Sequence, residues 1–135
     1  MPHLAFQLSA TPPADAQARL ADAVIGHFAA IMDTGTDHIA VSVRCGLVLA
    51  FRRAGPGPVA FLDADLRRGR TSDQKRRFAL AVFEELQRHC GVPARNAYVI
   101  FTEHDGPDFH LDDGALPSWS EGEDPLAALK EPPRR

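Results

Sequence analysis

The sequence predicts an α/β protein in which two fused βαβ units share one four-stranded sheet, with both helices on one face. Three observations support this fold class: the order strand–helix–strand occurs twice, the break AGPGP (54–58) separates the two copies, and both predicted helices carry an apolar stripe. A helix that joins two parallel strands forms a right-handed crossover, so each half should fold as a unit. We therefore expect a single domain, 1–135, made of repeats 2–53 and 58–104 and a C-terminal tail, 105–135.

The first repeat should begin with a strand over residues 2–8, where apolar residues alternate with others. Pro2 is tolerated at the first position of a strand because it removes only one ladder donor. A helix of about twenty residues should follow, reach residue 32 or 33 and be ended by Gly35. The β-branched and apolar segment 39–51 then predicts a strand or a pair of strands. The buried stripe of the helix should consist of Leu20, Val24, Phe28 and Ile31.

The second repeat follows the same order. Residues 59–66 read as a strand, and a helix should begin after Thr71, which forms a capping box with Gln74. Gly91 stands where a glycine commonly terminates a helix, and residues 96–103 read as the returning strand. The apolar stripe of this helix should consist of Phe78, Val82 and Leu86.

Two helices on one face leave the other sheet face uncovered, which suggests that this face packs against partner subunits. The tail is rich in Asp, Gly and Pro and contains the single tryptophan of the chain, Trp119. A tail of this composition is expected either to fray or to lie across a neighbouring subunit.

Composition excludes several function classes. The formal net charge of −3 argues against general nucleic-acid binding, which requires a basic face. No apolar run has membrane-spanning length, and the first residues lack the regions of a signal peptide. Cys45 and Cys90, without a CxxC spacing, fit reduced thiols in a cytoplasmic protein, and we expect both to be buried among apolar residues. The acidic residues within 105–113 match no ligand template, so we expect no metal there.

Two features could carry chemistry. Met-Pro is a bond that cells normally trim, and a trimmed chain would begin with Pro2, whose nitrogen would be a free secondary amine. That amine is either an accident of the terminus or a catalytic group. Arg67, Arg68 and Arg70 precede the second helix, where cations oppose the helix dipole. This arrangement favours anion binding, although a solvated loop is the alternative.

Three stretches together resemble the tautomerase superfamily, whose members use an amino-terminal proline as acid or base. They are Pro2 before a strand, LRRGRTSDQKRRF (66–78) and YVIFTEHDGPDF (98–109). The doubled unit is similar to the fused members of that superfamily: 5-carboxymethyl-2-hydroxymuconate isomerase, malonate semialdehyde decarboxylase and cis-3-chloroacrylic acid dehalogenase.

The resemblance implies roles for particular residues. Pro2 would be the general acid or base, and Arg70 would hold the carboxylate of the substrate together with Arg67 or Arg68. The spacing of Arg67 and Arg70 resembles the arginine pair of the dehalogenase, and that of Arg68 and Arg70 resembles the decarboxylase pair. Arg44 matches a further substrate-binding arginine but could equally pair with a carboxylate across a subunit interface. The resemblance also implies a homotrimer without cofactor or metal.

The resemblance further implies that Phe109 forms an apolar wall of the site. The sequence also departs from the superfamily pattern. Ile100 stands where the dehalogenase has a tyrosine, and Leu111 stands where it has a water-activating glutamate. The dehalogenase uses a histidine near His27, but His27 is one position out of phase and is better explained as a packed or surface residue. The aspartate of the decarboxylase has no convincing match either, and Ser42 falls near that place. These losses weaken hydrolytic dehalogenation and decarboxylation, whereas proton transfer needs only an amine and an anion clamp.

The chemistry is consistent with these residue types. An α-amine has a pKa of roughly 7.7–8.0, and both burial and nearby guanidinium groups disfavour its charged form. The same guanidinium groups can grip a carboxylate through two parallel hydrogen bonds. The sequence therefore predicts a cofactor-independent isomerase that moves a proton in small enol, keto or unsaturated carboxylic acids. The alternatives are a hydratase, dehalogenase or decarboxylase of the same superfamily, and an oligomeric binding protein without enzymatic activity.

Overall fold

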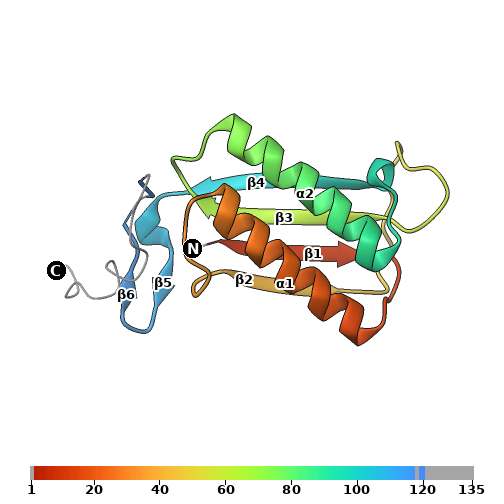
Figure 1. Ribbon diagram of the computed structural model, residues 1–135, viewed down its shortest axis with the longest axis horizontal. Helices are drawn as coiled ribbons and strands as arrows, with labels where there is room; N and C mark the ends of the chain where they lie inside the picture. Colours follow the sequence, from red (N-terminus) through yellow and green to blue (C-terminus); the bar gives the residue numbers. More distant parts are fainter. Residues whose placement is uncertain (1, 118, 121–135) are drawn as a thin grey trace.

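The computed structural model describes residues 2–117, 119 and 120 and contains one four-stranded mixed sheet covered on one face by two helices (Figure 1). The strands lie in the order β2 (Ala40–Arg44), β1 (His3–Leu8), β3 (Ala60–Arg67) and β4 (Ala97–His104). β1 pairs parallel with β2, β3 pairs parallel with β4, and the central pair β1–β3 is antiparallel. The predicted fold class is confirmed.

Each helix connects the two strands of its own repeat. α1 spans Ala14–Ile31 and α2 spans Ser72–Cys90. The capping box predicted for the second helix is present: the Thr71 side chain accepts a hydrogen bond from the Gln74 backbone, and the Gln74 side chain accepts one from the Thr71 backbone. Gly91 ends α2 in the left-handed conformation that glycine adopts without strain, with φ of 65°. Among the described residues, no helix has the length and apolarity needed to cross a membrane.

The first repeat differs from its prediction in two places. α1 ends at Ile31, with Met32 as its cap and Asp33 at a positive φ of 52°, so Asp33 and not Gly35 makes the turn. β2 is a single strand of five residues, because the chain after it turns away at Gly46, where φ is 68°. Residues 45–59 form no strand, so the expected pair of strands is one.

The core lies between the helices and the sheet. Phe28 of α1 and Phe78 of α2 meet edge to face there, with ring centroids 5.2 Å apart. Burial of apolar side chains at this interface is the main stabilising term of the fold. The fully buried side chains of the strands alternate, as the sequence pattern predicts: Leu4, Phe6, Leu8, Ala60, Leu62, Ala64 and Leu66.

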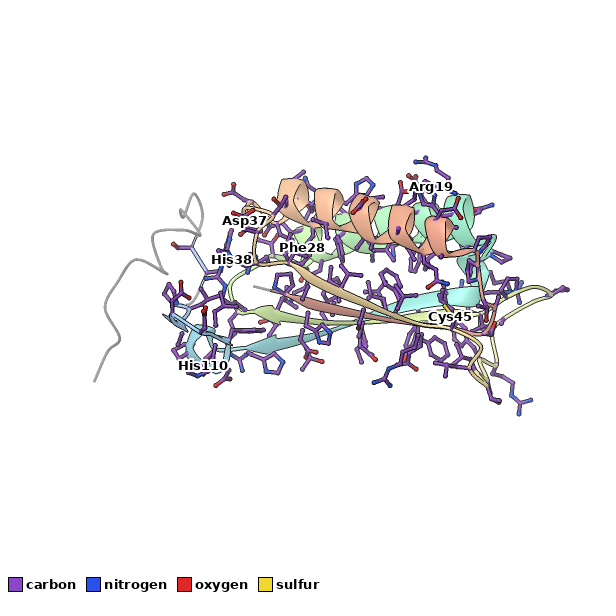
Figure 2. All side chains as sticks on the ribbon, turned by 90° about the horizontal axis from the view of Figure 1, so that it is seen from below. Arg19, Phe28, Asp37, His38, Cys45 and His110 are labelled. Atoms are coloured by element: carbon purple, nitrogen blue, oxygen red, sulfur yellow. The ribbon has the colours of Figure 1, made fainter. Side chains whose placement is uncertain are left out.

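The opposite sheet face is uncovered in the monomer, with side chains projecting from it (Figure 2). Polar pairs cross it from strand to strand, including Gln7 with Asp63 at 2.9 Å and His104 with Asp65 at 2.8 Å. At one end an aromatic cluster forms, in which the Phe61 and Tyr98 rings lie 4.9 Å apart. The expectation that this face contacts partner subunits stays a prediction.

The segment after β4 returns to its own sheet end. A 3₁₀ turn (Gly106–Asp108) leads into a small hairpin, β5 (His110–Leu111) and β6 (Gly114–Ala115), which lies beyond the tips of β3 and β4 in Figure 1. Leu116 is buried, 3% exposed. Within 105–120, Leu116 and Trp119 contact their own chain, so this part of the tail is not frayed. Contact of the tail with a neighbouring subunit stays a prediction, and residues 118 and 121–135 lie outside the described part.

A buried carboxylate links the two helices. Glu85 of α2 is 3% exposed and accepts hydrogen bonds from Arg88 at 3.0 Å, and its oxygens lie 3.3 Å from His27 Nε2 of α1 and 2.8 Å from His89 Nε2. The His27 side chain is 38% exposed, so of the packed and surface positions expected for it, the structure shows a partly exposed one. Burial raises the pKa of Glu85, but the hydrogen bonds from the two histidines and the charge of Arg88 outweigh it, so the net pKa is lowered.

We expect the Glu85 carboxylate to stabilise the fold at neutral pH and to lose this effect in acid. Because the pKa in the native state lies below the ordinary value of 4.5, the stabilisation is complete above pH 4.5 and disappears as the pH falls below it. Glu85→Gln should lower the free energy of unfolding by about 1–3 kcal/mol at pH 7. Urea denaturation of both proteins from pH 3 to pH 7 measures this, at matched protein concentration.

Glu84→Gln is the control, because Glu84 is the neighbouring exposed carboxylate on the same helix. The role of the buried charge would be contradicted if both variants lost the same free energy of unfolding at pH 7. It would also be contradicted if Glu85→Gln lowered the free energy of unfolding as much at pH 3 as at pH 7.

Candidate functional site

Pro2 lies at the end of the sheet where β3 and β4 finish. Because β1 and β3 are antiparallel, with His3 opposite Asp65, the start of β1 lies beside the end of β3. Pro2 is buried, and its carbonyl oxygen accepts a hydrogen bond from the Ala40 backbone at 3.1 Å. In Figure 1 the beginning of the chain lies at the same end of the sheet as β5 and β6. The antiparallel pairing of the two repeats thus brings the beginning of the chain to the sheet end that carries the arginine-bearing turn, residues 67–70.

Arg67 is the last residue of β3 and is 2% exposed. It pairs in register with His104, the last residue of β4. One guanidinium nitrogen, Nη1, donates a hydrogen bond of 2.7 Å to the carbonyl oxygen of Pro117. Its burial therefore depends on the C-terminal segment, which lies across this end of the sheet.

Arg68, unlike Arg67, lies at the surface. Its side chain is 59% exposed and forms an ion pair of 2.8 Å with Asp105, which is also exposed. Exposed pairs of this kind contribute little to stability. Of the two arginines that the sequence left open as the partner of Arg70, the structure buries Arg67 and leaves Arg68 at the surface.

Arg70 follows a sharp turn and is 6% exposed. Gly69 makes this turn at φ of 122°, a conformation that side chains rarely adopt. The guanidinium carbon of Arg70 lies 4.5 Å from the centre of the Trp119 ring and 5.8 Å from the centre of the Phe28 ring. Aromatic faces at such distances attract a cation, which helps to offset the cost of burying it.

Phe109 stands at the same end, directly after the 3₁₀ turn. Its ring meets the His104 imidazole edge on, with centroids 5.5 Å apart. His104 in turn lies 2.8 Å from the Asp65 carboxylate. Phe109 is half-buried at this end of the sheet, and the role of apolar wall that the resemblance implies for it stays a prediction.

Arg44 is not brought to this end. It is the last residue of β2 and pairs with Gln7, five residues along β1 from Pro2. At the rise of a strand this separation is about 16 Å. Arg44 is exposed, and within one protomer it lies at the opposite end of the sheet. A contact of Arg44 with substrate requires the site of a neighbouring subunit, and this remains a prediction.

The sequence reasoning missed two residues of the site. Trp119 was placed in the tail without a role, and Phe28 was recognised only as part of the helix stripe. The pattern around Trp119 offers no periodic signal, because its position depends on how the chain returns after β4. For Phe28, the signal was its place near the C-terminal end of α1, at the same sheet end as the arginine turn.

Arg67 and Arg70, two buried guanidinium groups, lie at the sheet end where β1 begins and make up the candidate site, with the Trp119 and Phe28 rings near Arg70. Such a site can hold a carboxylate and can stabilise negative charge that develops next to it. Among residues 2–117, 119 and 120, no group of three or more His, Cys, Asp or Glu side chains is placed to hold a metal ion.

The chain has the fold of the tautomerase superfamily. Its structure resembles the macrophage migration inhibitory factor of Toxoplasma gondii with a TM-score of 0.73 and 18% sequence identity, over 84% of this chain and 99% of the other. N1, a member of the cis-3-chloroacrylic acid dehalogenase family, aligns with a TM-score of 0.73 at 22% identity, over 86% and 84% of the two chains.

A malonate semialdehyde decarboxylase aligns with a TM-score of 0.64 and 22% identity, over 89% of this chain and 92% of the other. No protein-family model matches the sequence. No curated protein sequence matches it significantly. The similarity is thus one of fold.

We expect Gly69→Ala to distort the site. A Cβ at this position would lie 3.0 Å from Trp119 Cε3 and 3.1 Å from the Trp119 carbonyl oxygen, in addition to the unfavourable φ. The substitution should lower the free energy of unfolding by about 1–3 kcal/mol and change the Trp119 fluorescence spectrum.

Gly26→Ala is the matched control, because Gly26 lies on α1 and a Cβ there would meet no atom within 4 Å. It should raise stability by about 0.5–1 kcal/mol and leave the fluorescence unchanged. If Gly69→Ala has the same free energy of unfolding and the same emission spectrum as the parent protein, Trp119 does not pack against Gly69.

Proposed function

We propose that the protein is a cofactor-independent tautomerase that moves a proton in small enol, keto or unsaturated carboxylic acids. Pro2 is its general base, and Arg70 with Arg67 holds the substrate carboxylate. The observation that carries this proposal is the burial of Arg67 and Arg70 at the sheet end where β1 begins. The fold, shared with a decarboxylase and a member of a dehalogenase family, is compatible with this chemistry, and a decarboxylase or dehalogenase of the same superfamily is the alternative.

The proposed mechanism needs Met1 to be removed, because only then does Pro2 carry a free secondary amine. Burial and the neighbouring guanidinium groups favour the uncharged amine, which can accept a proton at neutral pH. It removes a proton from one atom of the substrate, leaving a dienolate whose charge the arginines stabilise. The protonated amine then returns the proton to another atom, which completes the tautomerisation without any further group.

Phe109 is proposed to exclude water from one side of the bound acid. The uncovered sheet face supports the further proposal of a homotrimer, since exposed aromatic and apolar residues such as Tyr98 and Ile100, 43% and 46% exposed, lie on it. Arg44, at the far end of the protomer, is proposed to reach the site of a neighbouring subunit in that assembly.

The base can be tested directly. Intact-mass analysis should find the chain without Met1, and Pro2→Ala should lower kcat for tautomerisation of phenylenolpyruvate by at least about a hundredfold, because a primary amine replaces the cyclic one. The pH profile of kcat/KM in the parent protein should report the pKa of the free base. Retention of Met1 in the active protein, or full activity of Pro2→Ala, would reject Pro2 as the base.

The anion clamp can be tested on Arg70. Arg70→Gln should lower kcat/KM for the same substrate on the order of tenfold to a hundredfold, because a charge-assisted and two-pronged hydrogen bond is lost. Arg70→Lys should recover only part of this loss, since lysine keeps the charge without the planar fork.

Arg76→Gln is the matched control: it removes the same charge from the exposed side of α2. If Arg70→Gln and Arg76→Gln reduce kcat/KM equally, the effect comes from net charge, and the proposal that Arg70 binds the substrate carboxylate is wrong.

A further inference from the structure

Trp119 contacts the arginine-bearing turn and the turn after α1. Its ring lies over the Arg70 guanidinium, 4.5 Å from centroid to Cζ. Its indole Nε1 donates a hydrogen bond of 3.2 Å to the carbonyl oxygen of Asp33, the residue that makes the turn after α1. Gly69 allows the ring to approach the backbone closely, since a Cβ there would lie 3.0 Å from it. Two segments of the chain, the turn after α1 and the turn at Gly69 and Arg70, thus define the position of one aromatic ring.

The segment that carries Trp119 is itself anchored. Leu116 is 3% exposed, its backbone nitrogen donates to the Phe109 carbonyl oxygen at 3.1 Å, and the Pro117 carbonyl oxygen accepts the 2.7 Å hydrogen bond from Arg67. The segment therefore contacts both buried arginines: it binds Arg67 through its backbone and Arg70 through its aromatic ring. Its sequence position, about fifty residues after the arginines, means that these contacts form only when the chain after β4 folds back.

We propose that Trp119 is the positioning residue of the anion site: it holds the Arg70 guanidinium in a fixed orientation and keeps water from its face, so that carboxylates bind to a preorganised group. This inference rests on the proposed function only in taking the ligand to be a carboxylate. An arginine side chain has several rotatable bonds and loses conformational entropy when a ligand fixes it. If Trp119 already fixes the side chain, this loss no longer reduces the affinity for the ligand. A cation beneath an aromatic face and screened from water also attracts an anion more strongly than a hydrated one does.

A binding experiment tests the proposal without any turnover. Trp119 is the single tryptophan of the chain, so fluorescence of the full-length protein excited at the long-wavelength edge of indole absorption, where Tyr98 does not absorb, reports on this ring alone. Titration with crotonate, a small unsaturated carboxylate, should change the tryptophan emission saturably, whereas the neutral crotonamide should not. Arg70→Gln should abolish the change, and Arg76→Gln, at the exposed side of α2, should keep it.

Calorimetric titration with crotonate then separates positioning from simple packing. Trp119→Phe keeps an aromatic face over Arg70 and should bind within about threefold of the parent. Trp119→Leu keeps an apolar side chain without that face and should bind about tenfold more weakly, the loss expected for one cation–π contact. Melting curves of both variants establish that they are folded. Equal affinity of Trp119→Leu and the parent protein, no binding of crotonate by the parent, or a parent emission that does not change at calorimetric saturation would each overturn the proposal.

The proposal also predicts that Trp119 affects KM more than kcat. Trp119→Leu should raise KM for an enol acid about tenfold with a smaller change in kcat, and Trp119→Phe should restore KM. A parent protein that binds crotonate with the fluorescence change but shows no tautomerase activity would refute the proposed function and leave the role of Trp119 standing. A parent protein that is active while Trp119→Leu has an unchanged KM would refute the role of Trp119 alone.

Discussion

The antiparallel pairing of β1 with β3 is the constraint on which the rest of the structure depends. Within each repeat the strands are parallel, so each repeat alone keeps the beginning of its first strand away from its own helix start. Only the central pair, with His3 opposite Asp65, places the beginning of the first repeat beside the end of β3 in the second. The buried proline and the arginine-bearing turn therefore come from different repeats, and the candidate site exists only when both repeats have folded onto one sheet.

The burial of two guanidinium groups is the second condition. Removing a charge from water is costly unless it is compensated, and Arg67 and Arg70 are 2% and 6% exposed. One short segment contributes to this compensation for both arginines: the Pro117 carbonyl oxygen for Arg67 and the Trp119 ring for Arg70. The apolar core beneath, with Phe28 close to Arg70, lowers the dielectric around these charges and makes their contacts stronger. The residues after β4 thus contact the two arginines of the candidate site directly.

Much of the fold could be predicted because it is specified locally. The apolar period of α2, the capping box of Thr71 with Gln74 and the terminal Gly91 all act within a few residues, and each is confirmed. The choice between Arg67 and Arg68 could not be made from the sequence. The alternating burial along β3 would leave Arg67 half-exposed like Asp63 and Asp65, but the returning segment covers it. Contacts between residues fifty positions apart have no periodic signature, and for the same reason the position of Trp119 escaped prediction.

The loop between the repeats has a further consequence. It lies at the far end of the sheet from Pro2, where Figure 1 shows it extending beyond the strands. The buried Asn96 amide fastens its second half, bonding to Gly55, Pro56 and Pro58, whereas Val48 in its first half is fully exposed. Within the single chain, the unfastened first half of this loop is therefore the part where a protease can cut or an inserted peptide can be accommodated, whereas the second half is held by Asn96.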